Sequence, residues 1–251
     1  MLFRRVAQKK IPETDAIFNQ LAQINPRADE DETVLRLSLD AKARVWVGDY
    51  SRGGLTRVIV KALDHDFDPR AKMIPFGIYL PQYNEVYLYF MTSKLTSDFI
   101  ADCLEDFWLS QGHRFPQVKT LLLNLDNGSE NSSRRTQFMK RITDFADTFQ
   151  ITMQLAYYPP YHSKYNPIER VWGVLEQHWN GALLDTCDTV LKFAQTMTYK
   201  GQQPVVKFVQ AIYHTGVGLT HKQMAKLEQR FDRLEALPKW FVRIVPLPSG
   251  I

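Results

Sequence analysis

The chain has 251 residues, 45% of them hydrophobic and 23% charged, and its 31 Lys and Arg residues against 27 Asp and Glu residues give a net charge of +4. These values are ordinary for a soluble globular protein with a sizeable core, and the small positive charge permits a polyanionic partner without requiring one. Two cysteines exclude a disulfide framework and, by themselves, a four-ligand zinc site, and no apolar stretch approaches the ~18 residues that span a membrane.

The first third of the chain predicts a lead-in followed by strands. Residues 1–33 are expected to form a short helix and a polar linker, because the composition becomes polar from Asn25 onward. Three strands are then predicted at Val34–Leu39, Arg44–Val47 and Glu85–Met91. Their closeness in sequence favours an antiparallel meander.

Helices and strands alternate from there to about residue 182. The pattern predicts a helix from Ser97, an apolar strand at Thr120–Leu125, a helix capped by Ser133, a strand at Ile151–Tyr157 and a helix beginning near Pro167. The order is β-β-β-α-β-α-β-α, an α/β domain over residues 34–182 whose mixed sheet is flanked by helices. Residues 183–251 are expected to form a C-terminal helical extension, with one helix starting at Thr220.

Three acidic residues stand at the ends of predicted elements. Asp40 ends the first strand, Asp126 ends the apolar strand, and Glu169 lies in the first turn of a helix. Carboxylates that converge from separate rigid elements are the ligands that a pair of Mg²⁺ ions needs for phosphodiester cleavage. Taken singly, each Asp is more typical of a turn or a cap than of a metal ligand.

The local pattern leaves two interpretations of Glu169 open. Asn166, Pro167 and Glu169 fit a capping box, in which Glu169 would bond back to the Asn166 amide, as well as they fit metal ligation. Glu176 shares the helix face but lies two turns away, roughly 10 Å along the axis, so it and Glu169 cannot serve one metal pair.

Three segments resemble the acidic motifs of one enzyme superfamily. The segment Tyr158–Trp172 (YPPYHSKYNPIERVW) resembles the third acidic motif of bacterial insertion-sequence transposases of the DDE superfamily, which are relatives of mariner-like transposases and retroviral integrases. Leu123–Asn131 (LNLDNGSEN) is similar to their second motif and Ser38–Ala43 (SLDAKA) to their first. The likeness runs roughly from residue 35 to 181, and Pro238–Phe241 is similar to a stretch near the family's C-terminus.

The resemblance implies an RNase H-like catalytic domain in which Asp40, Asp126 and Glu169 hold two Mg²⁺ ions, with Mn²⁺ as a substitute. It implies hydrolysis at transposon ends and attack of the freed 3′-hydroxyl on target DNA, by a homodimer or a larger synaptic assembly. These transposases usually carry an upstream helix-turn-helix region, and no such motif precedes Asp40. The expectation is that the chain is a fragment or has lost specific DNA binding.

Other residues near the three motifs are secondary candidates. Phosphate contacts are expected from Arg134, Arg135, Lys140, Lys164 and Arg170, although each singly is typical of a solvated basic face, as is Arg141. Asn127 and His162 are secondary site candidates, and an exposed turn is the alternative for His162. Base stacking by Tyr157, Tyr158, Tyr161 and Tyr165 competes with simple packing. The clusters Gly53-Gly54 and Asp64–Asp68 are interpreted as turns.

Two other functions remain open from the sequence. An RNase H-like nuclease without strand transfer would use the same three carboxylates, and a non-catalytic DNA-binding or assembly module derived from a transposase would use none of them.

The basic N-terminal segment has no apolar run behind it and so predicts no signal peptide. With this, the resemblance implies the bacterial cytoplasm, in association with the nucleoid, as the expected location.

Overall fold

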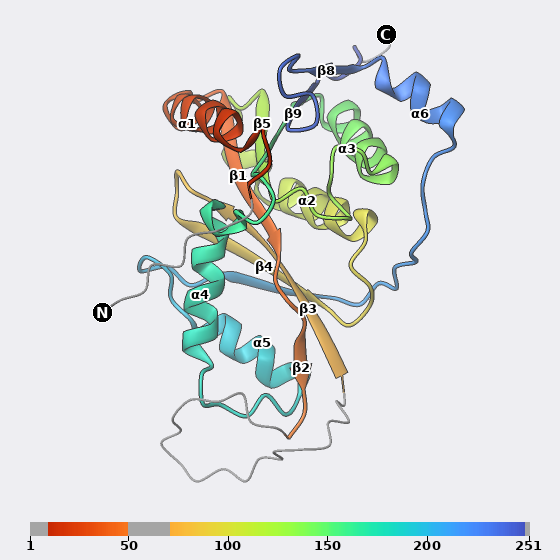
Figure 1. The fold of residues 1–251 in the computed structure, drawn as a ribbon. Helices are drawn as coiled ribbons and strands as arrows, with labels where there is room; N and C mark the ends of the chain where they lie inside the picture. Colours follow the sequence, from red (N-terminus) through yellow and green to blue (C-terminus); the bar gives the residue numbers. More distant parts are fainter. Residues whose placement is uncertain (1–9, 50–70, 249–251) are drawn as a thin grey trace.

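The strand predicted at Val34–Leu39 lies near the middle of a large mixed sheet in the computed structural model, which describes residues 10–49 and 71–248 (Figure 1). The helices are α1 Thr14–Glu30, α2 Ser97–Gln111, α3 Thr136–Phe149, α4 Ile168–His178, α5 Cys187–Thr196 and α6 His221–Glu228. The strands are β1 Val34–Ala41, β2 Val45–Val47, β3 Ala71–Leu80, β4 Glu85–Met91, β5 Thr120–Leu125, β6 Thr152–Tyr157, β7 Val205–Val209, β8 Phe231–Arg233 and β9 Phe241–Ile244. Short 3₁₀ turns at Gly112–Arg114 and Ser163–Tyr165 complete these elements.

The sheet runs in the order β7-β4-β3-β1-β5-β6-β9-β8, with β2 paired to β3. β1 is parallel to β5 and antiparallel to β3, and β5 is parallel to β6. Helices α2 and α3 cover one face, whereas α1, α4 and α5 lie on the other (Figure 1). The predicted α/β fold with a mixed sheet flanked by helices is confirmed.

One strand in the first half of the chain was not predicted. β3 pairs with β1, β2 and β4, so it replaces the expected direct meander of the three predicted strands. Its sequence hides it because Pro75 and Gly77 disfavour strands and because both of its faces are buried, which removes the alternation. The N–H that Pro75 lacks would point to the same side as its carbonyl, which accepts the Lys42 amide. Pro75 is tolerated because that side faces the segment between the end of β1 and the start of β2.

The segments on both sides of residues 34–182 also differ from expectation. The expected linker is largely helical, because α1 continues through Pro26 to Glu30, where Ala28 is buried and Asp29 forms an ion pair with Arg36. Residues 183–251 contain helices α5 and α6, as expected, and in addition three strands: β7 extends the sheet beside β4, and β9 and β8 extend it beside β6.

Two further expectations concern particular residues. Ser133 does not cap α3, whose N-cap is Arg135; the Ser133 hydroxyl instead donates to the Lys239 carbonyl at 2.7 Å. The clusters Gly53-Gly54 and Asp64–Asp68 lie outside the described residues.

Within the described parts of the chain, no helix combines the length and apolarity needed to cross a bilayer.

Candidate active site

Asp40 lies near the carboxyl end of β1, and Asp126 directly follows β5, so the two residues occupy equivalent positions on neighbouring parallel strands. The register pairs Ser38 of β1 with Asn124 of β5, and each Asp follows two residues later in its own chain segment. Residues two apart share a face of the sheet, and adjacent strands are about 4.8 Å apart. The parallel register therefore directs both carboxylates to the same face, at the carboxyl ends of the strands.

Glu169 reaches the same region from helix α4. Asp40 is 7% exposed, whereas Asp126 and Glu169 are half-buried. Burial raises the pKa of Asp40 well above its ordinary value, and the negative charges of Asp126 and Glu169 raise that pKa further. The Trp172 indole, which donates to Oδ2 of Asp40 at 3.0 Å, opposes the shift. The three predicted carboxylates thus lie within electrostatic reach of one another.

The start of α4 is held by β1 and not by a capping box. The Asn166 carboxamide accepts a hydrogen bond from the Ser38 hydroxyl at 2.5 Å and donates one to the Leu39 carbonyl at 3.0 Å, and the Asn166 amide bonds to the Ser163 carbonyl. The capping-box interpretation of Glu169 is therefore wrong, because the amide that it requires already has another partner.

Glu176, the rejected alternative to Glu169, has structural partners. Its carboxylate forms an ion pair with Lys42 at 2.7 Å and accepts the Trp179 indole N–H at 2.9 Å. These contacts tie the later turns of α4 to the segment that follows β1. The half-buried Glu169 at the helix start remains the residue whose charge acts on Asp40.

The loop after β5 adds a residue that sequence reasoning missed. Asn127 has a φ of 61°, a left-handed conformation that Asn tolerates, and the turn brings the Gly128 amide to Oδ1 of Asp126 at 3.1 Å. Asn131 donates to the same oxygen at 2.9 Å, while its own Oδ1 is buried with no hydrogen-bond partner among the described residues. The segment LNLDNGSEN contained this signal, since Asn131 ends it.

A divalent cation fits this region by its chemistry. The available ligands are carboxylates, and a bound cation would neutralise their mutual repulsion. The cation, or a water bound to it, would also give the buried Asn131 oxygen an interaction partner. A Cβ on Gly128 would lie 3.3 Å from that oxygen and from both oxygens of Asp126, so the glycine keeps this space open. In residues 10–49 and 71–248, however, no three His, Cys, Asp or Glu side chains form a group already arranged to hold a metal ion.

His162 belongs to a different part of the surface. It is 5% exposed and packs against Phe18 of α1 and against Tyr165, so the expectation of an exposed turn is wrong. Burial lowers the pKa of His162, and the charges of Lys164 and Lys10 lower it further. None of the three acidic residues contributes to this shift, so His162 faces α1 and the basic side chains near it.

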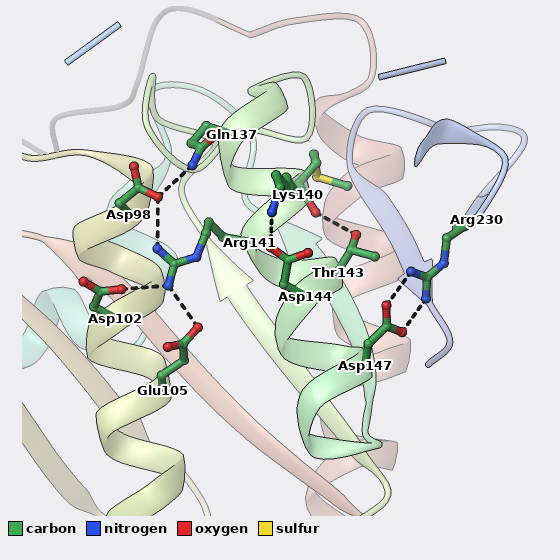
Figure 2. A network of polar contacts seen from close by, with 11 residues as sticks. Asp98, Asp102, Glu105, Gln137, Lys140, Arg141, Thr143, Asp144, Asp147 and Arg230 are labelled. Atoms are coloured by element: carbon green, nitrogen blue, oxygen red, sulfur yellow. Dashed lines mark hydrogen bonds and ion pairs between the residues drawn. The ribbon is translucent and has the colours of Figure 1, made fainter. Parts of the chain in front are cut away.

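The predicted basic residues separate into exposed and paired groups. Arg134, Lys140, Lys164 and Arg170 are exposed, and Lys140 also pairs with Asp144, whereas the half-buried Arg135 pairs with Glu130 at 3.6 Å. Figure 2 shows Arg141 of α3 bound between three carboxylates of α2, at 3.0 Å to Asp98, 2.7 Å to Asp102 and 2.9 Å to Glu105. Arg141 therefore joins two helices and is not available to a phosphate.

The four tyrosines around the third motif divide in the same way. Tyr157 and Tyr158 are buried, and the Tyr157 hydroxyl donates to the Asn131 carbonyl at 2.8 Å. Tyr161 and Tyr165 are 64% and 51% exposed, and Lys164 lies over the Tyr165 ring. Packing explains the first two, whereas the second two present aromatic surface between β6 and α4.

Comparison with solved structures identifies the class of fold. A Mos1 mariner paired-end complex with Mn aligns with a TM-score of 0.53 at 10% identity, over 77% of this chain and 57% of that chain. A Mos1 transposase paired-end complex with left transposon end gives 0.52 at 11%, over 77% and 56%. The chain thus spans somewhat more than half the length of the Mos1 chains that it matches. The likeness shows the RNase H-like fold.

The family described as the Rhodopirellula transposase DDE domain matches residues 2–246. The chain therefore belongs to this family of transposase DDE domains, which confirms the resemblance seen in the three motifs. No curated protein matches the chain.

Proposed function

We propose that the chain is the catalytic domain of a DNA transposase that hydrolyses phosphodiester bonds at transposon ends and joins the freed 3′-hydroxyl to target DNA. The observation that carries the proposal is that Asp40, Asp126 and Glu169 converge from β1, the end of β5 and the start of α4 in a chain that belongs to a family of transposase DDE domains. The charges of Asp126 and Glu169 add to burial in raising the pKa of Asp40, in accord with this convergence. Three acidic side chains from β1, the β5 loop and α4 would not be kept in mutual repulsion for stability. Perturbed carboxylates of this kind favour a functional site.

In this proposal Asp40, Asp126 and Glu169 hold two Mg²⁺ ions, or Mn²⁺ in their place, and Asn131 supports Asp126. When bound, such ions lower the pKa of a nucleophilic water or hydroxyl and stabilise the leaving oxygen. The protein's own contribution is orientation: Trp172 fixes one oxygen of Asp40, and the Gly128 amide and Asn131 fix one oxygen of Asp126. Burial of Asp40 excludes water from its side of the site.

DNA is the proposed substrate, and it would approach over the exposed side chains around the third motif. Lys164 and Arg170 supply positive charge there, and Tyr161 and Tyr165 supply rings that can stack on unpaired bases. Arg134, which follows the second motif, supplies a further exposed positive charge. The similar Mos1 structures include a paired-end complex with left transposon end and a strand transfer complex, which supports a synaptic dimer or larger assembly. Cytoplasmic action on the nucleoid would follow from such a substrate.

A cleavage assay tests the proposal directly. The purified protein is incubated with a plasmid that carries the DNA flanking its coding sequence, in Mg²⁺ or Mn²⁺. Nicking at the ends is expected, and Asp40→Ala, Asp126→Ala and Glu169→Gln should each abolish it while the circular dichroism spectrum stays native. The control is Asp188→Asn, which changes an exposed carboxylate paired with Lys192. Cutting at the parent rate by a variant lacking all three carboxylates would refute the mechanism, and nicking without joined products would favour the nuclease alternative.

A further inference from the structure

Asn166 makes one hydrogen bond next to Asp40 and another to Glu169. Its side chain is fully buried, and Nδ2 donates to the Leu39 carbonyl, which belongs to the peptide bond that joins Leu39 to Asp40. Its backbone carbonyl accepts the Glu169 amide at 3.0 Å. Two hydrogen bonds through one residue therefore link the backbones that carry two of the three carboxylates.

Ser38 completes this link from the side of the sheet. Its hydroxyl, also fully buried, donates to Oδ1 of Asn166 and accepts the Ile168 amide at 2.9 Å. The first amides of a helix lack partners within the helix, and here a strand supplies the cap that a residue of the helix would ordinarily supply. Ser38 lies on the same strand face as Asp40, two residues before it.

We propose that the Ser38–Asn166 pair is a positioning device that sets the distance between Asp40 and Glu169 for metal binding. The inference rests on the proposed function, which assigns those carboxylates to the metal ions. Neither residue touches substrate or metal, because both are fully buried and their polar atoms are engaged with each other and with the backbone. They act through the backbone of the residues that do.

The physical reason lies in the geometry that ligands require. β1 and α4 are separate elements, more than a hundred residues apart in the chain, and apolar packing alone permits small shifts and rotations of a helix on a sheet. A carboxylate pair must be held within about 0.5 Å to bind well. Three directional hydrogen bonds at the level of Ser38, Leu39 and Ile168 fix the first turn of α4 against β1, so they fix Glu169 against Asp40.

The test is Mn²⁺ binding by the full chain without DNA, measured by the electron paramagnetic resonance signal of free Mn²⁺, for Ser38→Ala, Asn166→Ala and the double variant. Residues that orient metal ligands typically contribute about 10–100-fold to affinity, so each single variant is expected to bind Mn²⁺ more weakly by that factor. Because the pair acts as one unit, the double variant should lose no more than the weaker-binding single variant.

The matched control is Thr143→Val, which removes a buried hydroxyl that donates to the Met139 carbonyl in α3. It should lower stability without changing Mn²⁺ affinity. If Ser38→Ala loses stability like this control but binds Mn²⁺ as the parent does, the positioning role is refuted while the proposed function stands. Additive losses in the double variant would also refute it. A parent that binds no Mn²⁺ would overturn both the proposed metal site and this inference. Should Asn166→Ala fail to fold, the comparison of Ser38→Ala with Thr143→Val decides.

Discussion

Trp172 and Asp40 are joined by a hydrogen bond from the indole Nε1 to Oδ2 at 3.0 Å, across the interface between α4 and β1. The contact is possible because the residue paired with Asp40 on β3 is Gly77. A Cβ at Gly77 would lie 2.9 Å from atoms of both Trp172 and Ile168, closer than side-chain packing allows. The absence of a side chain at Gly77 thus allows α4 to pack close enough to β1 for Trp172 to reach Asp40.

Replacing Gly77 by alanine should therefore displace α4. We expect Gly77→Ala to lower the free energy of unfolding by about 1–3 kcal/mol through overpacking, and to weaken Mn²⁺ binding as Trp172 moves from Asp40. Urea unfolding and Mn²⁺ titration measure the two effects. Gly173→Ala is the matched control, since a Cβ there meets nothing within 4 Å and α4 should gain about 0.5–1 kcal/mol. Equal stability of the two variants would contradict this account.

Asp40→Asn should stabilise the metal-free protein at neutral pH. Because the pKa of Asp40 is raised in the folded state, its contribution to stability is present below its unfolded value near 3.8 and is lost as the pH rises through the folded value. The ionised group therefore destabilises the folded protein at pH 7, and each pKa unit corresponds to about 1.4 kcal/mol. Asparagine can still accept the Trp172 N–H.

The measurement is urea unfolding in a chelating buffer between pH 4 and pH 7. The variant should exceed the parent by about 1 kcal/mol or more at pH 7, and the gap should close toward pH 4. Added Mn²⁺ should stabilise the parent and leave Asp40→Asn unchanged, since binding to the folded state raises stability. Parallel pH profiles of the two proteins would show that Asp40 is not under the repulsion described.

Asn131→Leu should separate metal binding from folding. The change removes the donor to Asp126 and the buried oxygen that has no partner among the described residues, and it keeps the branched shape of the side chain. Mn²⁺ affinity should fall about 10–100-fold. Stability should fall little, because an orphaned buried acceptor costs free energy. Isothermal titration calorimetry with Mn²⁺ measures the affinity, and the control is Ser129→Ala, which changes an exposed residue of the same loop. Parent-like affinity would exclude Asn131 from the site.

The basic residues should differ in their effect on DNA binding. Arg134→Ala and Arg170→Ala are expected to weaken binding to duplex DNA and to reduce the slope of log affinity against log salt by about 0.9 for each phosphate that the variant no longer neutralises. Arg141→Ala should leave the slope unchanged and lower stability instead, because Arg141 is bound by three carboxylates of α2. The slopes of log affinity against log salt concentration are measured by fluorescence anisotropy between about 50 and 200 mM salt. A smaller slope for Arg141→Ala, with parent-like slopes for Arg134→Ala and Arg170→Ala, would show that the DNA contacts Arg141 and not the two exposed arginines.

The sequence by itself determined the elements that carry the acidic residues. The alternation of leucines after Val34 and the apolar run Thr120–Leu125 predicted β1 and β5 to within two residues at each end. The Asn166-Pro167 pattern predicted the start of α4 to within one residue. The three motifs also indicated the family, because the order and spacing of Asp40, Asp126 and Glu169 can be compared without coordinates.

Only the tertiary structure decided how those elements meet. β3 escaped prediction since its Pro75 and Gly77 are tolerated by neighbours that local patterns do not show. Three segments of the C-terminal extension, Val205–Val209, Phe231–Arg233 and Phe241–Ile244, became strands because the sheet offered open edges beside β4 and β6. Asn166 resembled a helix cap and proved to bond to β1 instead. Periodicity reports what a residue does for its own helix or strand, whereas a buried polar side chain takes its partner from whatever the fold brings near.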